Sequence, residues 1–93
     1  MVTWDEKKGL ANIKVHGLDF LGCEAIWDDF TVTPEDVREI YREQRMVVFG
    51  RLNRRVVVLV YTEHRRGPHV ISLRKAEKYE ARYYIAEAKD YDG

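Results

Sequence analysis

The sequence is short of the features that mark exported and membrane proteins. It has a single cysteine, Cys23, so no internal disulfide can form. Its longest apolar run, Val56–Tyr61, falls far below the roughly 20 residues that a membrane-spanning helix needs. The first residues, Met-Val-Thr-Trp-Asp, lack the basic-then-apolar pattern of a signal peptide. Together these absences predict a cytoplasmic protein in a reducing compartment.

Metal-binding and repeat patterns are also missing. The histidines His16, His64 and His69 do not show the spacing of metal ligands, so we expect no metal and no cofactor. No repeat, low-complexity tract or interior linker divides the chain, which predicts one domain over residues 1–93. A content of 45% hydrophobic and 12% aromatic residues is enough for one core. Cys23 falls in an apolar helical pattern, which predicts a buried, unreactive thiol.

Charge is present in quantity, and it is segregated beneath a net charge of zero. Residues 45–75 contain eight cationic side chains and one acid, a local charge of +7. Residues 24–43 contain seven acids and two arginines, a local charge of −5. A concentrated positive field attracts polyanions, and phosphate backbones are the commonest of these. The acidic segment would repel RNA, so we expect it to lie away from the basic surface, either docked on a basic partner segment or solvated.

The N-terminal third of the chain predicts an edge strand and two helices. The edge strand is Val2–Trp4. The first helix begins after the N-cap Asp5 and ends at Gly17, with helical spacing of Leu10, Ala11, Ile13 and Lys14. The second helix is capped by Asp19 and buries Leu21, Ala25 and Ile26. Thr33-Pro34, followed by acids, then predicts a short further helix.

The rest of the chain predicts a meander and a last helix. The strands are Arg45–Gly50, Arg55–Glu63 and His69–Arg74, and the all-apolar middle of the second indicates a central strand covered on both faces. The last helix spans Lys75–Lys89, with one expected stripe of Ala76, Tyr79, Tyr83 and Ala86 and a second of Ala81, Ile85 and Ala88. Two N-terminal helices, an antiparallel sheet of three to four strands and a C-terminal helix make an α+β fold.

An ordered set of short motifs resembles one protein family. The chain is similar to BrnT-type toxins, the toxin halves of type II toxin–antitoxin pairs. The resemblance rests on Trp4-Asp5-x-x-Lys8-x-x-x-Asn12-x-x-x-His16-Gly17-x-x-Phe20, Ile26-Trp27-Asp28-Asp29, Glu43-x-Arg45, Gly50, Val60-Tyr61-Thr62-Glu63, Ile71-Ser72-x-Arg74-Lys75-Ala76 and Glu80.

The resemblance implies a function and partners. It implies a RelE-like ribonuclease fold and an RNA-cleaving toxin that needs no metal and blocks translation. It also implies a cognate antitoxin with a ribbon-helix-helix DNA-binding part, assembly as a homodimer or as a heterotetramer with the antitoxin, and autoregulation of the operon by the complex. Trp4, Asp5, Lys8 and Asn12 are interpreted as a cluster that defines the fold.

Candidate catalytic residues lie at the ends of the second and third strands. Cleavage of RNA without metal requires a base for the 2′-hydroxyl, positive groups for the phosphorane and an acid for the leaving 5′ oxygen. Glu63, His64, Arg65 and Arg74 are expected to converge across the 64–68 turn. Arg74 is the first choice because its guanidinium binds a phosphate bidentately. Glu63 is a candidate base, with a cross-strand salt bridge to Arg74 or Arg51 as the alternative.

The remaining cations are candidate contacts to the RNA backbone. They are Arg51, Arg45, Arg66, Lys75 and Lys8.

A second function stays open. Val15, His69 and Leu73 depart from the family pattern, as does the placement of His64 after Glu63. The alternative is a non-catalytic toxin-fold module that binds an antitoxin-like partner, RNA or both. A scaffold with no nucleic-acid role is a third possibility, and it predicts an RNA affinity that does not change with salt.

Overall fold

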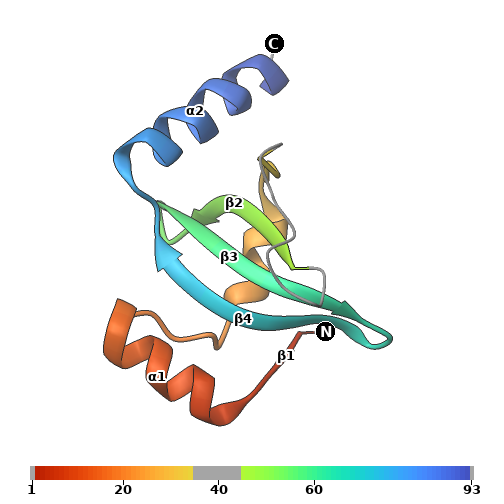
Figure 1. The fold of residues 1–93 in the computed structure, drawn as a ribbon. Coiled ribbons are helices and arrows are strands. Elements are labelled where there is room, and N and C mark those ends of the chain that lie inside the picture. Colours follow the sequence, from red (N-terminus) through yellow and green to blue (C-terminus); the bar gives the residue numbers. More distant parts are fainter. Residues whose placement is uncertain (1, 35–44, 93) are drawn as a thin grey trace.

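The computed structural model describes residues 2–34 and 45–92. Its elements in chain order are β1 (Thr3–Trp4), α1 (Glu6–His16), the 3₁₀ helix η1 (Cys23–Asp28), β2 (Met46–Leu52), β3 (Arg55–His64), β4 (Gly67–Lys75) and α2 (Lys78–Asp92) (Figure 1). The three long strands and α1 fall where the sequence predicts them. The last helix is present, but it begins at Lys78 and ends at Asp92 rather than spanning Lys75–Lys89, because β4 continues to Lys75. The short helix predicted after Thr33-Pro34 lies outside the described residues.

The sheet has the order β1-β4-β3-β2 and is mixed, which corrects one expectation. β2, β3 and β4 form the predicted antiparallel meander. β1 is an edge strand, as predicted, but it pairs in parallel with β4, Thr3 opposite His69 and Trp4 opposite Val70. A purely antiparallel sheet is therefore wrong. Apolar patterning predicts that a segment is a strand, but it does not predict which strand it pairs with. The choice of partner decides whether the pairing is parallel or antiparallel.

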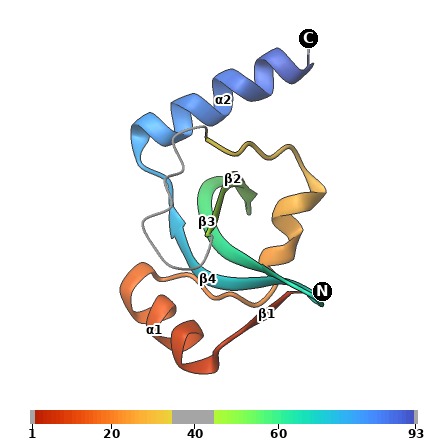
Figure 2. The same ribbon diagram turned by 45° about the vertical axis from the view of Figure 1, so that its right-hand side comes forward.

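Each face of the sheet has its own apolar cluster. Alternation along β3 sends Val57 and Leu59 to one face and Val58 to the other. The first face packs on Phe20 and Ile26, from the chain around η1, whereas Tyr84 of α2 packs on the second. Figure 2 shows α1 and α2 on opposite sides of the sheet. The prediction that β3 is a central strand covered on both faces is thus confirmed.

α1 has the predicted ends and is held to the sheet by a polar side chain. The carboxylate of Asp5 accepts a hydrogen bond from the backbone N–H of Lys7 at 2.8 Å, and Gly17 closes the helix at φ 73°. The buried amide of Asn12 accepts from the N–H of Leu73 and donates to its carbonyl. Leu10 points outward and is 65% exposed. Hydrogen bonding by Asn12, rather than the apolar spacing, therefore sets which side of α1 meets β4.

The second N-terminal helix is shorter than predicted. The carboxylate of Asp19 accepts from the N–H of Leu21, but this closes a turn, and Leu21 is 75% exposed. Gly22 then takes a left-handed conformation (φ 84°), and η1 begins after it. In a helix with three residues per turn, positions i and i+3 share a face, so Cys23 and Ile26 are both buried while Ala25 is exposed.

α2 is rotated relative to the predicted stripes. Tyr84 and Glu80 face inward, and Tyr79 is 71% exposed. Ile85 and Ala86 are also exposed, whereas Ala76, Tyr83 and Ala88 pack against the core, so each expected stripe is correct only in part. The rotation follows from Arg74, which lies on β4 and binds the Glu80 carboxylate with both terminal nitrogens. In the described part of the chain, no helix is long and apolar enough to cross a membrane.

Candidate nucleic-acid interface

The expected catalytic cluster is divided between the two ends of the sheet. In the β3–β4 hairpin, Glu63 lies opposite Pro68 and His64 opposite Gly67, whereas Arg74 lies opposite Val58. At about 3.3 Å per residue, Arg74 is roughly 20 Å from the hairpin turn. The expectation that Arg74 converges with Glu63, His64 and Arg65 is therefore wrong. In an antiparallel hairpin, a residue on one strand lies opposite the residue on the other strand that is equally far from the turn. Arg74 is much farther from the turn than Glu63 and His64 are, so it lies opposite Val58 instead.

Two groups of cations result. The β2–β3 end contains Arg51, Arg54, Arg55, Arg74 and Lys75, and the β3–β4 end contains Arg65 and Arg66 with the side chains of Glu63, His64 and His69. Arg45 directly precedes β2, whose first residue Met46 pairs with Tyr61, so it belongs to the β3–β4 end. Figure 1 shows the β3–β4 hairpin at one extreme of the sheet and the β2–β3 turn beside the start of α2 at the other. Lys8 is exposed on α1.

Arg74 is bound by a carboxylate in the described structure. Its Nη1 and Nη2 donate to the two oxygens of Glu80 at 2.8 and 2.9 Å, and Nη1 also approaches the carbonyl of Lys75 at 3.4 Å. Glu80 in turn accepts from the N–H of Glu77 at 2.7 Å, which is half of a capping box at the start of α2. Hydrogen bonds from Arg74 lower the pKa of Glu80, and those to Glu80 raise the pKa of Arg74. The pair fixes the start of α2 on β4, and no salt bridge joins Glu63 to Arg74 or Arg51 in the described residues.

Arg54 occupies a backbone conformation that arginine disfavours. Leu52 pairs with Arg55, so Asn53 and Arg54 form a two-residue hairpin turn, with φ values of 51° and 66°. Such turns favour Asn-Gly because both central residues are left-handed. A non-glycine side chain there costs about 1 kcal/mol. Residues in disfavoured backbone conformations often occur at functional sites. At this position Arg54 adds a second guanidinium beside that of Arg55.

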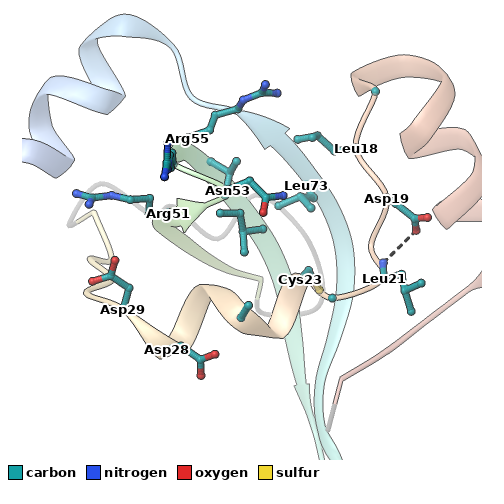
Figure 3. A pocket seen from close by; sticks show the side chains of 16 residues that line it. Leu18, Asp19, Leu21, Cys23, Asp28, Asp29, Arg51, Asn53, Arg55 and Leu73 are labelled. Atoms are coloured by element: carbon teal, nitrogen blue, oxygen red, sulfur yellow. Dashed lines mark hydrogen bonds between the residues drawn. The ribbon is translucent and has the colours of Figure 1, made fainter.

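A groove opens beside this turn. It has a volume of about 690 Å³ and is open to solvent. Arg51, Arg54 and Arg55 contribute one wall, and the segment from Gly17 to Asp29 contributes the other (Figure 3). Asp28 and Asp29 of the acidic segment also line the groove, so the expectation that this segment lies away from the basic surface is wrong for these two residues. The groove therefore offers donors on one side and acceptors on the other.

A second hollow adjoins this groove on the α2 side of β2. It has a volume of about 580 Å³ and shares Arg51, Asp28 and Asp29 with the groove. Its remaining lining includes Phe30, Thr31, Tyr84, Ala88 and Tyr91. The guanidinium carbon of Arg51 lies 5.6 Å from the ring centroid of Tyr84, which is a cation–π contact.

At the β3–β4 end two imidazoles lie together. Thr62 pairs with His69, so His64, two residues further, projects from the same face. The rings of His64 and His69 are stacked, with centroids 5.0 Å apart and an interplanar angle of 11°. The hydroxyl of Thr3 lies 2.8 Å from Nδ1 of His69, so β1 holds this ring in place. Arg65 and Arg66 form the turn that follows His64.

Several of these residues were missed from the sequence. Arg54, Arg55 and His69 were not among the candidates. Two residues between two strands is the signal of a tight turn, and it would have placed Arg54 and Arg55 at one edge. The His64–His69 contact depends on the register, which no local pattern encodes. Among the described residues there is no cluster of three side chains able to hold a metal ion.

A mixed four-stranded sheet with a helix on each face and cations at both ends defines a small α+β protein with surfaces suited to a polyanion. The comparisons identify the family. Residues 4–80 match the family model described as "Ribonuclease toxin, BrnT, of type II toxin-antitoxin system". The chain therefore belongs to the BrnT ribonuclease toxin family of type II toxin–antitoxin systems, as the motifs predicted.

A solved structure supports the assignment. The fold is similar to the crystal structure of the Brucella abortus ribonuclease toxin BrnT, with a TM-score of 0.63 and 25% sequence identity. The match covers 83% of this chain and 96% of the Brucella chain. No curated protein matches the sequence significantly.

Proposed function

We propose that this chain, acting as one toxin domain over residues 1–93, cleaves RNA without a metal ion and thereby blocks translation. A cognate antitoxin of the ribbon-helix-helix type would neutralise it. The observation that carries the proposal is membership of a ribonuclease toxin family, which matches 77 of the 93 residues, positions 4 to 80. The cations at the two ends of the sheet give the physical basis for RNA binding.

The chemistry is assigned to the β3–β4 end, where side chains able to move a proton lie beside cations. In the reaction the 2′ oxygen attacks phosphorus and loses its proton to a base. The 5′ oxygen leaves and receives a proton from an acid, and a 2′,3′-cyclic phosphate remains. His64 is the proposed acid or base because an imidazole ring can both accept and donate a proton. Arg65 and Arg66 would stabilise the negative charge on the phosphorane, and Glu63 remains a candidate base.

The contact between His64 and His69 suits this assignment. The two parallel rings, with centroids 5.0 Å apart, place two groups able to accept or donate a proton side by side. The hydrogen bond between the Thr3 hydroxyl and Nδ1 of His69 leaves Nε2 of that ring as the atom for proton transfer.

Arg74 is proposed as a positioning residue rather than a catalytic one. Its guanidinium is engaged by Glu80 and lies away from the histidines. It would act by holding α2 against the sheet beside Arg51.

The test is an RNA digest with purified protein in the presence of a chelator. Cleavage should persist with the chelator, and His64→Ala should lose about 100-fold or more in rate. His16→Gln is the matched control, because His16 is an exposed histidine at the end of α1. Loss of cleavage on chelation, or full activity of a folded His64→Ala variant, would contradict the proposal.

The block on translation and the antitoxin need a cellular test. Expression of the chain alone should arrest growth and protein synthesis, and His64→Ala should relieve the arrest without lowering the amount of folded protein. Co-expression of the cognate antitoxin should restore growth. Normal growth with abundant folded wild-type protein would count against toxicity.

One observation favours the alternative of a non-catalytic module. In the described structure both terminal nitrogens of the motif residue Arg74 bind the carboxylate of Glu80. A purely structural role for Arg74 is what a module that binds without cleaving would need. Such a module would bind RNA or an antitoxin without cutting RNA. RNA binding that weakens with salt, without any cleavage product over long incubation, would select this alternative.

A further inference from the structure

The hollow between the Asp28–Thr31 segment and α2 has a rigid aromatic floor. Tyr84 is fully buried, and its hydroxyl donates to the carbonyl of Phe30 at 2.7 Å. Phe30 contacts the rings of both Tyr84 and Tyr91, at centroid distances of 5.7 and 4.9 Å. Tyr91 is exposed, so a ring face remains available to a ligand. A row of three aromatic rings at the edge of a hollow is suited to a flat, conjugated group.

The hollow also has a donor side and an acceptor side. Arg51 lies over Tyr84, which restricts where its N–H groups can point. Asp29 lies on the same side as the guanidinium of Arg51, and Asp28 points away from it (Figure 3). In the described part of the chain no ion pair joins Arg51 to either carboxylate. The two charges therefore line one hollow without neutralising each other.

We propose that this hollow binds a guanine base of single-stranded RNA, a proposal that rests on RNA being the substrate of the chain. Guanine presents two acceptors, O6 and N7, along one edge, and an arginine fork binds both. Its neighbouring edge presents the donors N1–H and N2–H, and one carboxylate accepts from both. Arg51, Asp29 and Tyr91 supply the fork, the carboxylate and the stacking face.

Other ligands match the hollow less well. Adenine has an amino group where guanine has O6, so it would place a donor against the donors of Arg51. A bare phosphate would bind Arg51 but would be repelled by Asp28 and Asp29. A basic peptide would satisfy the carboxylates and leave Arg51 opposed by a like charge. Guanine satisfies both sides and uses the aromatic face.

The test uses RNA that cannot be cut. Fluorescently labelled 2′-O-methyl pentanucleotides, UUGUU and UUAUU, lack the 2′-hydroxyl nucleophile, so binding is measured without cleavage. The full chain should bind the guanine oligonucleotide about tenfold more tightly, as expected from one good bidentate pair. Equal affinity for the two oligonucleotides overturns the proposal.

Variants locate the contacts. Arg51→Lys keeps the charge and removes the fork, and Asp29→Asn replaces an acceptor by a donor, so each should abolish the guanine preference. Tyr91→Leu should weaken the binding of both oligonucleotides and leave the ratio of their affinities unchanged. Asp28→Asn is the matched control and should leave the ratio unchanged. A folded Arg51→Lys variant with the full preference, or a larger effect of Asp28→Asn than of Asp29→Asn, overturns the assignment.

The outcome is separable from the proposed activity. If the chain prefers guanine but cuts no RNA, the hollow is a base-binding site on a non-catalytic module and the proposed cleavage fails. If the chain cuts RNA without any preference for guanine near the cut, the ribonuclease stands and the guanine site fails.

Discussion

At the scale of single residues, the register of one hairpin separates Arg65 and Arg74, two arginines that were expected to converge across its turn. Arg74 belongs to a pair with Glu80 that joins β4 to α2, and Arg65 belongs to the opposite end of the sheet. The side chain of Arg74 is 35% exposed while that of Glu80 is 7% exposed. Removing the arginine therefore leaves a nearly buried carboxylate without its main partner. An unpaired charge that is nearly buried strongly destabilises the fold.

The pair predicts a matched loss in two variants. Arg74→Ala should destabilise the fold by about 2 kcal/mol, less than for a fully buried pair because the guanidinium is partly solvated. Glu80→Ala leaves only a partly solvated arginine, but it also removes the cap on the N–H of Glu77, so it should cost a similar amount. It should lower RNA cleavage to the same extent, because both variants release the start of α2. Urea denaturation and a cleavage assay check this. A stable Glu80→Ala variant with full activity, beside an inactive Arg74→Ala, would instead make Arg74 catalytic.

The same pair predicts an acid dependence. The pKa of Glu80 is lowered in the folded chain, chiefly by its hydrogen bonds to Arg74. A lowered folded pKa gives stability that is present above the ordinary value of 4.5 and is lost as the pH falls through the folded value. Urea midpoints of the wild type should therefore fall more steeply below about pH 4.5 than those of Glu80→Gln. Parallel pH profiles for the two proteins would contradict the assignment.

Cys23 gives a prediction about reactivity. Burial raises the pKa of its thiol to about 11, with a further contribution from Glu24. Because the thiolate is the reacting form, an aromatic disulfide reagent at pH 8 should modify the native chain about 100-fold more slowly than the urea-unfolded chain. Absorbance of the released thiolate measures both rates. Fast labelling of the native protein would show that η1 opens readily.

At the scale of elements, η1 lies directly on β2 with no room for a further methyl group. A Cβ at Gly50 would collide with the side chain of Ile26. Gly50→Ala should therefore cost about 2 kcal/mol by overpacking. Ile26→Ala makes room for the new methyl group. The double variant should therefore lose less stability than the sum of the losses in the two single variants. Thermal and urea unfolding of the cycle measure the coupling, and additive losses would show that β2 and η1 are not in contact.

The elements show how far sequence reasoning reaches. The strands and the ends of α1 were predictable because their signals are local: alternation along β3, a carboxylate at Asp5 and a left-handed glycine at Gly17. The rotation of α2 was not predictable from its apolar residues, because the Arg74–Glu80 contact decides it. The predicted longer helix is instead η1, because Gly22 takes a left-handed conformation before it. Glycine allows this conformation but does not require it, so the sequence alone does not predict the turn.

At the scale of the whole molecule, the basic segment seen in the sequence is divided between the two ends of the sheet. The +7 segment forms β2, β3 and β4, so its cations lie at the two ends of one sheet. The sequence predicted a basic sheet, but it could not say that the cations divide between two ends, since that depends on strand pairing. For the same reason the candidate site was predictable as a set of residue types and only partly as a set of neighbours.

Division of the cations predicts how RNA binding should respond to salt. For single-stranded RNA, each phosphate contact contributes about 0.7 to the slope of log affinity against log salt. Arg54→Gly and Arg66→Gln each remove a cation, one from the β2–β3 end and one from the β3–β4 end. If one RNA strand contacts both ends, each variant should reduce the slope by about 0.7 and the double variant by about 1.4.

Arg54→Gly has a second expected effect that distinguishes binding from folding. Glycine fits the left-handed turn better than arginine does, so this variant should be more stable by about 1 kcal/mol while it binds RNA more weakly. Fluorescence anisotropy across a salt series and urea unfolding measure the two quantities on one preparation. A slope that Arg54→Gly leaves unchanged, while Arg66→Gln lowers it, would confine the RNA to the β3–β4 end. A slope near zero for the wild type would leave the sheet without a nucleic-acid role, because neutralisation of phosphates by fixed cations must release counterions into solution.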